Sequence, residues 1–419
     1  MRASFFPAKL ATNSGQDVGL GRVARFRRLV LIFGLAAGLH LLAITRAEAQ
    51  DHADFRYETY NEGNGRIGVE TQSGLVEAKL TPWLSLKAEF VYDAISGATP
   101  TGAPPPDKIN FVNLNGPGPI PGQFSDKVPT VEMRDIRTAG TFDPIFSFGP
   151  NRITPEFSYS EEHDYVSYGA ALNYSLDLNN KNTTLNAGWS HDWDRVLPYT
   201  GTYINDAQGK DADEFLLGVN QLLGPKTVLT VNAIFGAAQG YLSDPYRGVL
   251  FTGYPQFDPA SISLAAENRP RHRETYAGFA SLNHFITPLD GAAEVSYRQY
   301  YDSYGIAAET VAAVWRQKIG NRATISPEFR YYRQTAADFY ATEFAGSPFA
   351  PAFNYYSSDY RLSEMQTVSF GVNLEVKVVE RFSVNLGYKR YIENGLDQAT
   401  SSSAYPSANI ITLGARLWF

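Results

Sequence analysis

The chain has 419 residues, with 36 Lys and Arg against 43 Asp and Glu, 26 Tyr, 26 Phe, 35 Gly and no Cys. A mean hydropathy of -0.26 is ordinary for a globular protein, while the aromatic-rich, Cys-free composition favours an all-β chain that passes through an oxidising compartment. The net negative charge argues against a nucleic-acid partner, because phosphates need a basic face.

The first 49 residues predict a cleaved signal peptide. Four arginines between Arg22 and Arg28 precede the apolar run Leu29–Ile44, and Ala47-Glu48-Ala49 supplies small residues at a cleavage site. The alternative is a membrane anchor, but His40 interrupts a run that is already short for one. We therefore expect residues 1–49 to be removed.

The mature chain, residues 50–419, carries 29 basic and 41 acidic residues, and no apolar stretch in it is long enough for a membrane-spanning helix. Alternation of apolar and polar residues predicts strands throughout it. The predicted segments are roughly 54–61, 65–80, 83–95, 131–143, 152–161, 165–178, 182–192, 213–223, 226–236, 273–286, 291–301, 306–318, 322–333, 361–378, 381–391 and 408–419. No linker interrupts the pattern, so we expect one domain.

Short and long connections alternate between these segments. The short ones are Thr81-Pro82, 144–151, 179–181, Gly224-Pro225, 287–290, Gly320-Asn321 and Val379-Glu380. The long ones are 96–130, 193–212, 237–272, 334–360 and 392–407. This order predicts a closed antiparallel up-and-down transmembrane β-barrel of about 16 strands in the outer membrane of a Gram-negative cell, surrounded by its lipid. A secreted sandwich is the alternative, although its strands are usually shorter.

Local motifs give little sign of an enzyme. The GNGRIG stretch at Gly63–Gly68 matches a dinucleotide fingerprint, but a strand follows it, and Asn64-Gly65 is better explained as a type I′ turn. We find no catalytic triad, nucleophile elbow or zinc-protease motif, and predict no catalytic residues and no cofactor. Weak metal-binding candidates are His52, third in the mature chain, and His163 in the EEHD loop; the SHDWD stretch at 190–194 is another.

The polar faces of the predicted strands carry many charges that would line the lumen. These pore-lining candidates are Lys87, Glu89, Glu294, Arg298, Arg316, Lys318, Glu328, Arg330, Glu375, Lys377, Lys389 and Arg416. One interpretation is a set of cross-strand ion pairs that brace the wall. The other is a polar passage whose charges tune solute selectivity, and the two are compatible.

The chain ends on the strand-like stretch ITLGARLWF. Gly414, Leu417 and Phe419 match a G-x-x-Φ-x-Φ pattern similar to the signals that the barrel-assembly machinery reads, although the polar residue usual before the Gly is Leu413 here. The last strand must also pair with the first to close a barrel. We therefore expect the stretch to be both an assembly signal and the closing seam.

Five segments resemble the bacterial DUF3570 family, in the family's order along the chain. They are YDAISGATPTG (92–102), SEEHDYVSYG (160–169), GYLSDPYR (240–247), YRQYYDSYGI (297–306) and RYYRQTAADFY (330–340). The resemblance implies an outer-membrane barrel of undefined substrate, with no catalytic residues. Members tend to be encoded beside thioredoxin-like and flavin-transferase proteins, which implies envelope redox or metal-homeostasis partners. We expect SGATPTG, LSDPYR and QTAADFY to gather at one rim of the barrel or to fold into its mouth, where they would form a constriction or a recognition surface.

The sequence thus favours a porin-like barrel that gives small solutes passive or gated passage. The alternative is a non-conducting barrel, plugged by the first long connection, that acts as a scaffold or export partner for envelope redox or metal-homeostasis proteins. A barrel enzyme is a weaker third reading, and the oligomeric state stays open.

Overall fold

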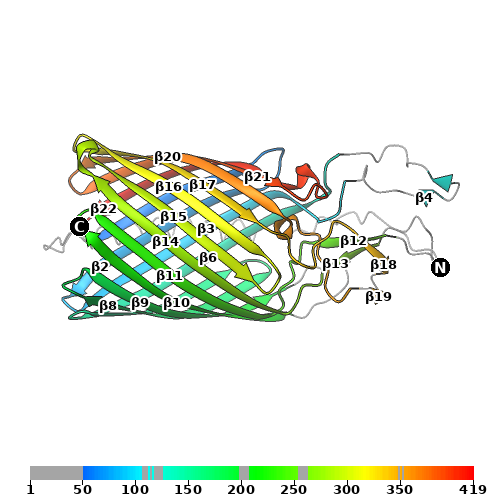
Figure 1. Cartoon of the computed structure of the whole chain (residues 1–419), viewed down its shortest axis with the longest axis horizontal. Coiled ribbons are helices and arrows are strands. Elements are labelled where there is room, and N and C mark those ends of the chain that lie inside the picture. Colours follow the sequence, from blue (N-terminus) through cyan, green and yellow to red (C-terminus); the bar gives the residue numbers. More distant parts are fainter. Residues whose placement is uncertain are drawn as a thin grey trace, which may run out of the picture. The chain divides into compact units, whose positions relative to one another are not determined.

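A computed structural model describes residues 51–105, 112–113, 116–117, 126–197, 207–252, 263–347, 350–351 and 353–419. The predicted signal peptide therefore lies outside the described residues, as does much of the first long connection. Sixteen antiparallel strands form a closed barrel, which β1 and β22 complete by pairing with each other (Figure 1).

The barrel strands are β1 (His52–Glu62), β2 (Gly68–Thr81), β3 (Leu84–Pro100), β6 (Thr130–Phe148), β7 (Asn151–Glu161), β8 (Tyr165–Leu178), β9 (Thr183–Val196), β10 (Gln208–Gly224), β11 (Thr227–Gly240), β14 (His272–Ile286), β15 (Gly291–Asp302), β16 (Ala307–Ile319), β17 (Ala323–Gln334), β20 (Met365–Val379), β21 (Phe382–Gly395) and β22 (Ser407–Trp418). Each pairs with its neighbour in chain order, so the predicted meander and strand number are confirmed. The short turns lie at the end of the barrel where β22 ends, and the long connections lie at the other end (Figure 1).

Three predicted boundaries were wrong for identifiable reasons. β3 continues to Pro100 and β10 begins at Gln208, because the strands extend beyond their apolar alternation at the long-connection end. The turn expected at 144–151 is confined to Gly149-Pro150, since β6 runs to Phe148. Pro144 lies where the β6–β7 pairing is interrupted, so its missing N–H costs no ladder bond there.

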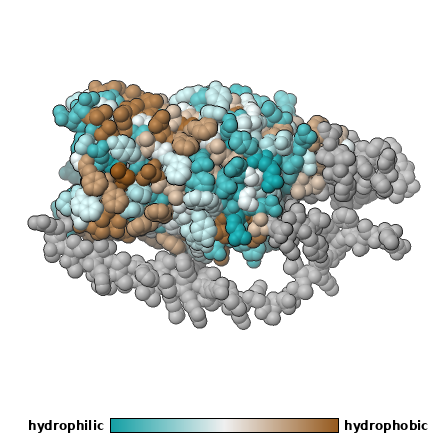
Figure 2. All heavy atoms as spheres, turned by 90° about the horizontal axis from the view of Figure 1, so that it is seen from below, coloured by the Kyte–Doolittle hydropathy of each residue, from teal (hydrophilic) through white to brown (hydrophobic). Residues whose placement is uncertain are grey.

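The pleat divides every strand between two faces, and large apolar side chains are exposed on one of them. Phe55, Phe157, Leu217, Val295 and Phe370 are examples. Figure 2 shows apolar residues gathered on the half of the visible surface away from the long connections, with hydrophilic residues beyond them. An exposed apolar band around a closed barrel fits lipid, so this face is the outer face and the opposite one is the inner face.

Tyrosines on the outer face mark one border of the apolar band. The hydroxyls of Tyr159 and Tyr276 donate to Glu161 and Glu274 at 3.0 and 2.9 Å, and Tyr297 donates to Gln299. In each pair the polar partner lies two residues nearer the long connections. Such amphipathic rings prefer the level of the lipid headgroups, which puts the long connections outside the hydrocarbon layer.

Six short strands within the long connections were not predicted from the sequence. β12 (Gly248–Thr252), β13 (Ser263–Ala266), β18 (Phe344–Ser347) and β19 (Ala350–Pro351) form one sheet, and β4 (Val112–Asn113) pairs with β5 (Gly116–Pro117). The short 3-10 helices are η2 (Thr287–Leu289), η3 (Tyr360–Leu362) and η4 (Ser402–Ala404). Among the described residues, no helix is long and apolar enough to span a membrane.

Candidate functional site: the inner face and the cap

The twelve predicted lumen residues all lie on the inner face. The strand register connects them: Lys87 pairs with Asp143, Arg316 with Ala292, Lys389 with Gly371, and Arg416 with Asp54, all opposite the exposed apolar side chains. Their contribution to solute selectivity remains a prediction.

Half of these residues form ion pairs with a residue of another barrel strand; three of the four pairs join neighbouring strands, and the pair of Lys389 with Glu328 spans β20. Lys87 lies 2.9 Å from Asp143, and Arg316 lies 2.9 Å from Glu294. Lys389 lies 2.6 Å from Glu328, and Arg416 lies 2.6 Å from Asp54. These contacts support the interpretation that many inner-face charges brace the wall, because each pair joins two strands and cancels its own charge.

Other inner-face charges have no such partner. Arg298 and Arg330 form no ion pair with a described residue, and their guanidinium groups lie 5.9 and 5.5 Å from the ring centroids of Tyr300 and Tyr332. Glu156 and Glu214 also face inward and were missed by the sequence analysis. Their alternation with Phe157 and Phe215 was the signal that could have found them.

A polar cavity of about 270 Å³ lies along the seam between β1 and β22. Its charged lining side chains are Asp54, Arg56, Glu89, Glu375 and Arg416. Carboxylates and guanidinium groups alternate there, so the inner face is hydrophilic at the seam as well as on the other strands.

The long connections fold into a compact unit that we call the cap, defined as the described parts of 241–271, 335–364 and 396–406. Its centre is Asp359, whose side chain is 1% exposed. Arg361 Nε donates to both Asp359 oxygens at 3.0 and 2.9 Å, and Arg269 Nη2 lies 2.7 Å from Oδ2. Arg247 Nε lies 3.5 Å from Oδ1. One carboxylate therefore joins three arginines from two connections.

Two further carboxylates balance the three arginines. Asp244 pairs with Arg361, and Glu267 lies 2.7 Å from Arg269. Burial opposes ionisation of Asp359, but the charge and hydrogen bonds of Arg361, then the charges of Arg247 and Arg269, outweigh it and hold the pKa of Asp359 below its usual value. Burial instead raises the pKa of Glu267, although Arg269 partly offsets this.

The cap is fixed to strand ends on different sides of the barrel. Arg247 donates to Thr99 Oγ1 at 3.0 Å and to the carbonyl oxygen of Pro100, at the end of β3. Its neighbour Tyr246 donates to Asp164 Oδ2 at 2.5 Å, in the connection between β7 and β8. The chain that carries both residues starts from β11. The β11–β14 connection therefore reaches across the mouth of the barrel.

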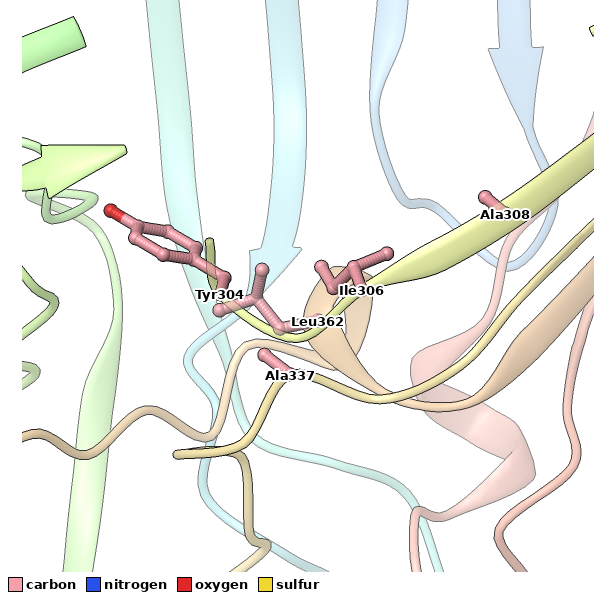
Figure 3. Close-up of a cluster of buried hydrophobic side chains, with 5 residues drawn as sticks. All are labelled: Tyr304, Ile306, Ala308, Ala337 and Leu362. Atoms are coloured by element: carbon pink, nitrogen blue, oxygen red, sulfur yellow. The ribbon is translucent and has the colours of Figure 1, made fainter. Parts of the chain in front are cut away.

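The cap also packs on the inner face itself. Leu362 of η3 lies against Tyr304, Ile306, Ala308 and Ala337 (Figure 3). Ala308 is an inner-face residue of β16, since it pairs with Tyr300 and Gln334. The part of the cap that contains η3 thus enters the mouth of the barrel.

A second apolar cluster, around Tyr360 of η3, also packs the cap against the barrel. Tyr360 and Tyr405 pack together with Met365 at the start of β20, and their rings meet edge to face at 5.6 Å. Arg66, between β1 and β2, donates to the carbonyl oxygens of Ser403 and Ala404 at 3.0 and 2.7 Å. The cap is therefore held from the seam as well.

Three of the segments that resemble the DUF3570 family meet in the cap, as expected. Thr99 and Thr101 of SGATPTG contact Arg247 and Gly248, where LSDPYR ends. Ala337 of QTAADFY packs in the same cluster as Leu362, together with Leu242 of LSDPYR. Their predicted gathering at one rim is confirmed, because SGATPTG contacts LSDPYR and LSDPYR packs in the same cluster as QTAADFY. Their role as a constriction remains a prediction.

The structure separates the metal candidates. His52 lies 3.8 Å from Asp54 at the seam, and the backbone N–H of His163 donates to Asp135 Oδ1 at 3.2 Å. The carboxylates of Asp135, Glu162 and Asp164 lie within 4.8 Å of one another beside His163. Burial first, then the charge of Asp135, raises the pKa of Glu162.

The SHDWD stretch does not form one site. His191 lies on the outer face, 2.8 Å from Asp213 and beside Trp193, whereas Asp192 and Asp194 lie on the inner face. Alternation along β9 separates them, because successive strand residues point to opposite faces.

The predicted assembly signal lies at the seam. Leu417 is on the outer face and 40% exposed, opposite Ala53 of β1, and Phe419 follows the last residue of β22. Gly414 has a local reason of its own: a Cβ there would lie 2.6 Å from the side-chain Oδ1 and Nδ2 atoms of Asn385. Recognition of these residues by the assembly machinery remains a prediction.

Solved structures of bacterial outer-membrane proteins align with this chain at low sequence identity. The siderophore receptor PirA from Pseudomonas aeruginosa aligns at 12% identity and a TM-score of 0.41, over 88% of this chain and 62% of that one. This chain thus spans less than two thirds of PirA. In-vitro folded OmpT, an outer membrane protein of Vibrio cholerae, aligns at 11% identity and a TM-score of 0.40, over 90% and 100%. CdiB from Acinetobacter baumannii aligns at 7% identity and a TM-score of 0.45, over 88% and 61%.

No protein with a curated description matches the chain in sequence. The closed barrel, its apolar outer face and its tyrosine border are those of a Gram-negative outer-membrane protein, and the outer membrane is where this chain resides. The family described as "Protein of unknown function (DUF3570)" matches residues 36–411. The chain belongs to this family.

Proposed function

We propose that the protein is a gated outer-membrane channel that gives small solutes passage through its lumen. The observation that carries the proposal is the cap: an ion-paired unit centred on Asp359 enters the mouth of a barrel whose inner face is polar. A sixteen-stranded barrel is wide enough for an aqueous passage. The three buried apolar clusters of the described residues involve the cap, and none fills the middle of the barrel.

Gating would require the cap to move away from the mouth. The cap is held by polar contacts at Thr99, Asp164 and Arg66 and by the apolar clusters around Leu362 and Tyr360. The polar contacts exchange for water at moderate cost, and the clusters join the cap to only a few residues at the mouth, whereas the backbone hydrogen bonds between the barrel strands have no alternative partners in lipid. The cap is thus the part of this protein best suited to alternate between two positions.

A second candidate function rests on the same cap. If it stays closed, the barrel is a non-conducting scaffold or export partner for envelope redox or metal-homeostasis proteins. An enzymatic role forms no part of either proposal.

Single-channel recording in planar bilayers distinguishes the two. We expect the wild-type protein to open rarely and Asp359→Ala, which leaves three arginines without their shared carboxylate, to open often. Glu364→Gln is the matched control, because it removes a solvent-exposed pair with Arg333 from the same connection. Heat-modifiable migration on gels checks that each variant is folded. A folded Asp359→Ala barrel that stays silent contradicts the channel and favours the scaffold, as does a stoichiometric co-purifying envelope protein.

A further inference from the structure

Charges on the inner face do not cancel evenly around the barrel. Once the ion pairs and the seam cavity, which holds Glu89 and Glu375, are set aside, the inner-face charges near the middle of the strands fall into two groups among the described residues. The acidic group is Glu156, Asp192 and Glu214, on β7, β9 and β10. The basic group is Arg298 and Arg330, on β15 and β17. No carboxylate of the acidic group has a basic partner within ion-pair distance.

The two groups lie on different sides of the lumen. In the ring of sixteen strands, β17 is eight positions from β7, the largest separation that such a ring allows, and five positions from β10. β15 is six positions from β7 and three from β10. The Arg330 side of the wall therefore faces the start of the arc from β7 to β10, and Arg298 lies between Arg330 and the other end of that arc.

Both groups keep their charged ends available. Arg298, Arg330 and Glu214 are exposed although they lie on the inner face, so their charged ends are open to solvent.

We infer that the lumen favours zwitterionic solutes, small molecules that carry both an ammonium and a carboxylate group, over neutral molecules of the same size. The ammonium group would face the arc from β7 to β10, and the carboxylate would face Arg298 and Arg330. Separated charges across a water-filled passage with low-dielectric walls create a transverse field. A solute with one charge is attracted by one side and repelled by the other, whereas a dipole aligned with the field gains at both ends. The inference rests on the proposed channel function.

Flux into proteoliposomes that contain the mature chain tests it, with β-alanine as the zwitterion and propionamide as the neutral probe of similar size. Each protein is measured with the wild-type cap and with Asp359→Ala. We expect β-alanine to enter faster than propionamide, on the order of tenfold. Arg298→Gln with Arg330→Gln, or Glu156→Gln with Asp192→Asn and Glu214→Gln, should bring that ratio towards one and leave propionamide flux unchanged.

The matched control is Glu328→Gln with Lys389→Gln, which removes one neutral ion pair from the same wall and should keep the wild-type ratio. Reversal potentials in a salt gradient give a second measurement. The double Arg variant should shift towards cations and the triple acidic variant towards anions. Equal flux of both probes in every protein, or unshifted reversal potentials, overturns the inference and leaves the channel standing. No flux of either probe, even with Asp359→Ala, overturns the channel and the inference together.

Discussion

Asp54 and Arg416 form a two-point ion pair across the seam that closes the barrel. Arg416 Nε donates to Asp54 Oδ1 and Nη2 donates to Oδ2, both at 2.6 Å, although 362 residues separate the two in sequence. The pair sits in the register that also places Leu417 opposite Ala53. A planar guanidinium fits a carboxylate in this way only when the two strands are aligned, so the pair reports on correct closure.

The ion pair at the seam predicts a small change in the free energy of unfolding, which a swap of the two charges should reverse. Asp54→Arg places two like charges together and should lower the free energy of unfolding, while the swap of Asp54→Arg with Arg416→Asp should restore most of it. Because the side chains are partly exposed, we expect a coupling energy of about 0.5–1 kcal/mol. Urea unfolding in lipid vesicles, followed by gel migration, measures the cycle. A swap no more stable than the single variant counts against the pair as a seam contact.

Asp359→Asn should release the cap without unfolding the barrel. The substitution leaves Arg247, Arg269 and Arg361 beside a neutral amide, and breaking a buried ion pair costs about 3–5 kcal/mol. Hydrogen exchange should rise sharply in η3 and residues 335–347 while β20 and β21 keep their protection. Glu364→Gln, with its exposed partner, should change exchange little. Uniform loss of protection across cap and barrel would show that the cap is not a separate unit.

The assignment of the two faces predicts that an arginine costs different amounts of folding free energy at two adjacent residues of β10. Leu217 is 66% exposed on the outer face, whereas Leu216 lies on the inner face beside Gly188. Leu217→Arg places a charge in lipid and should cost about 2–4 kcal/mol, while Leu216→Arg points into the polar lumen near Glu214 and should cost far less. Folding free energies in vesicles measure both. Equal costs would mean that the two faces have been assigned wrongly.

The cap should stay closed under mildly acidic conditions and open only at strongly acidic pH. The folded pKa of Asp359 is lowered, so its contribution is complete above the ordinary Asp value of about 3.9 and is lost as the pH falls below it. The folded pKa of Glu267 is raised, so its contribution is present at low pH and is lost as the pH rises through that pKa. Channel opening should therefore be no more frequent at pH 5 than at pH 7.5 and should rise below about pH 4. Frequent opening at pH 5 contradicts this.

The pattern of Gly414, Leu417 and Phe419 predicts an effect on assembly that is separate from stability. Phe419→Ala should reduce the amount of folded protein in the outer membrane of cells, because Phe419 belongs to the pattern that we expect the assembly machinery to read. Refolding of the purified chain into detergent should be unaffected, since β22 pairs through Trp418 without Phe419. Phe382→Ala, which removes an aromatic residue from the neighbouring strand at the same end, is the control. Equal losses in both variants would point to general destabilisation.

Much of the barrel follows from local patterns. Alternation such as Val368 to Val378 assigns two faces to a strand without knowledge of its neighbours, because the side-chain period is fixed by the backbone. Positive φ at Asn64 and Gly65 likewise matches the type I′ turn that their identity predicts. Strand number, turn ends and lumen-facing residues were therefore accessible from the sequence.

The contacts within the cap could not be predicted from local sequence patterns. Asp359 looks like any loop aspartate in the sequence, and its meeting with Arg247 and Arg269 depends on how connections about 100 residues apart fold together. The same holds for the lumen charges: whether Lys389 is cancelled by Glu328, or Arg330 is left without a carboxylate, depends on register and side-chain reach. The sequence by itself determined the barrel, since backbone geometry repeats every two residues. Only the tertiary structure decided which charges meet, since those contacts join residues that no local period relates.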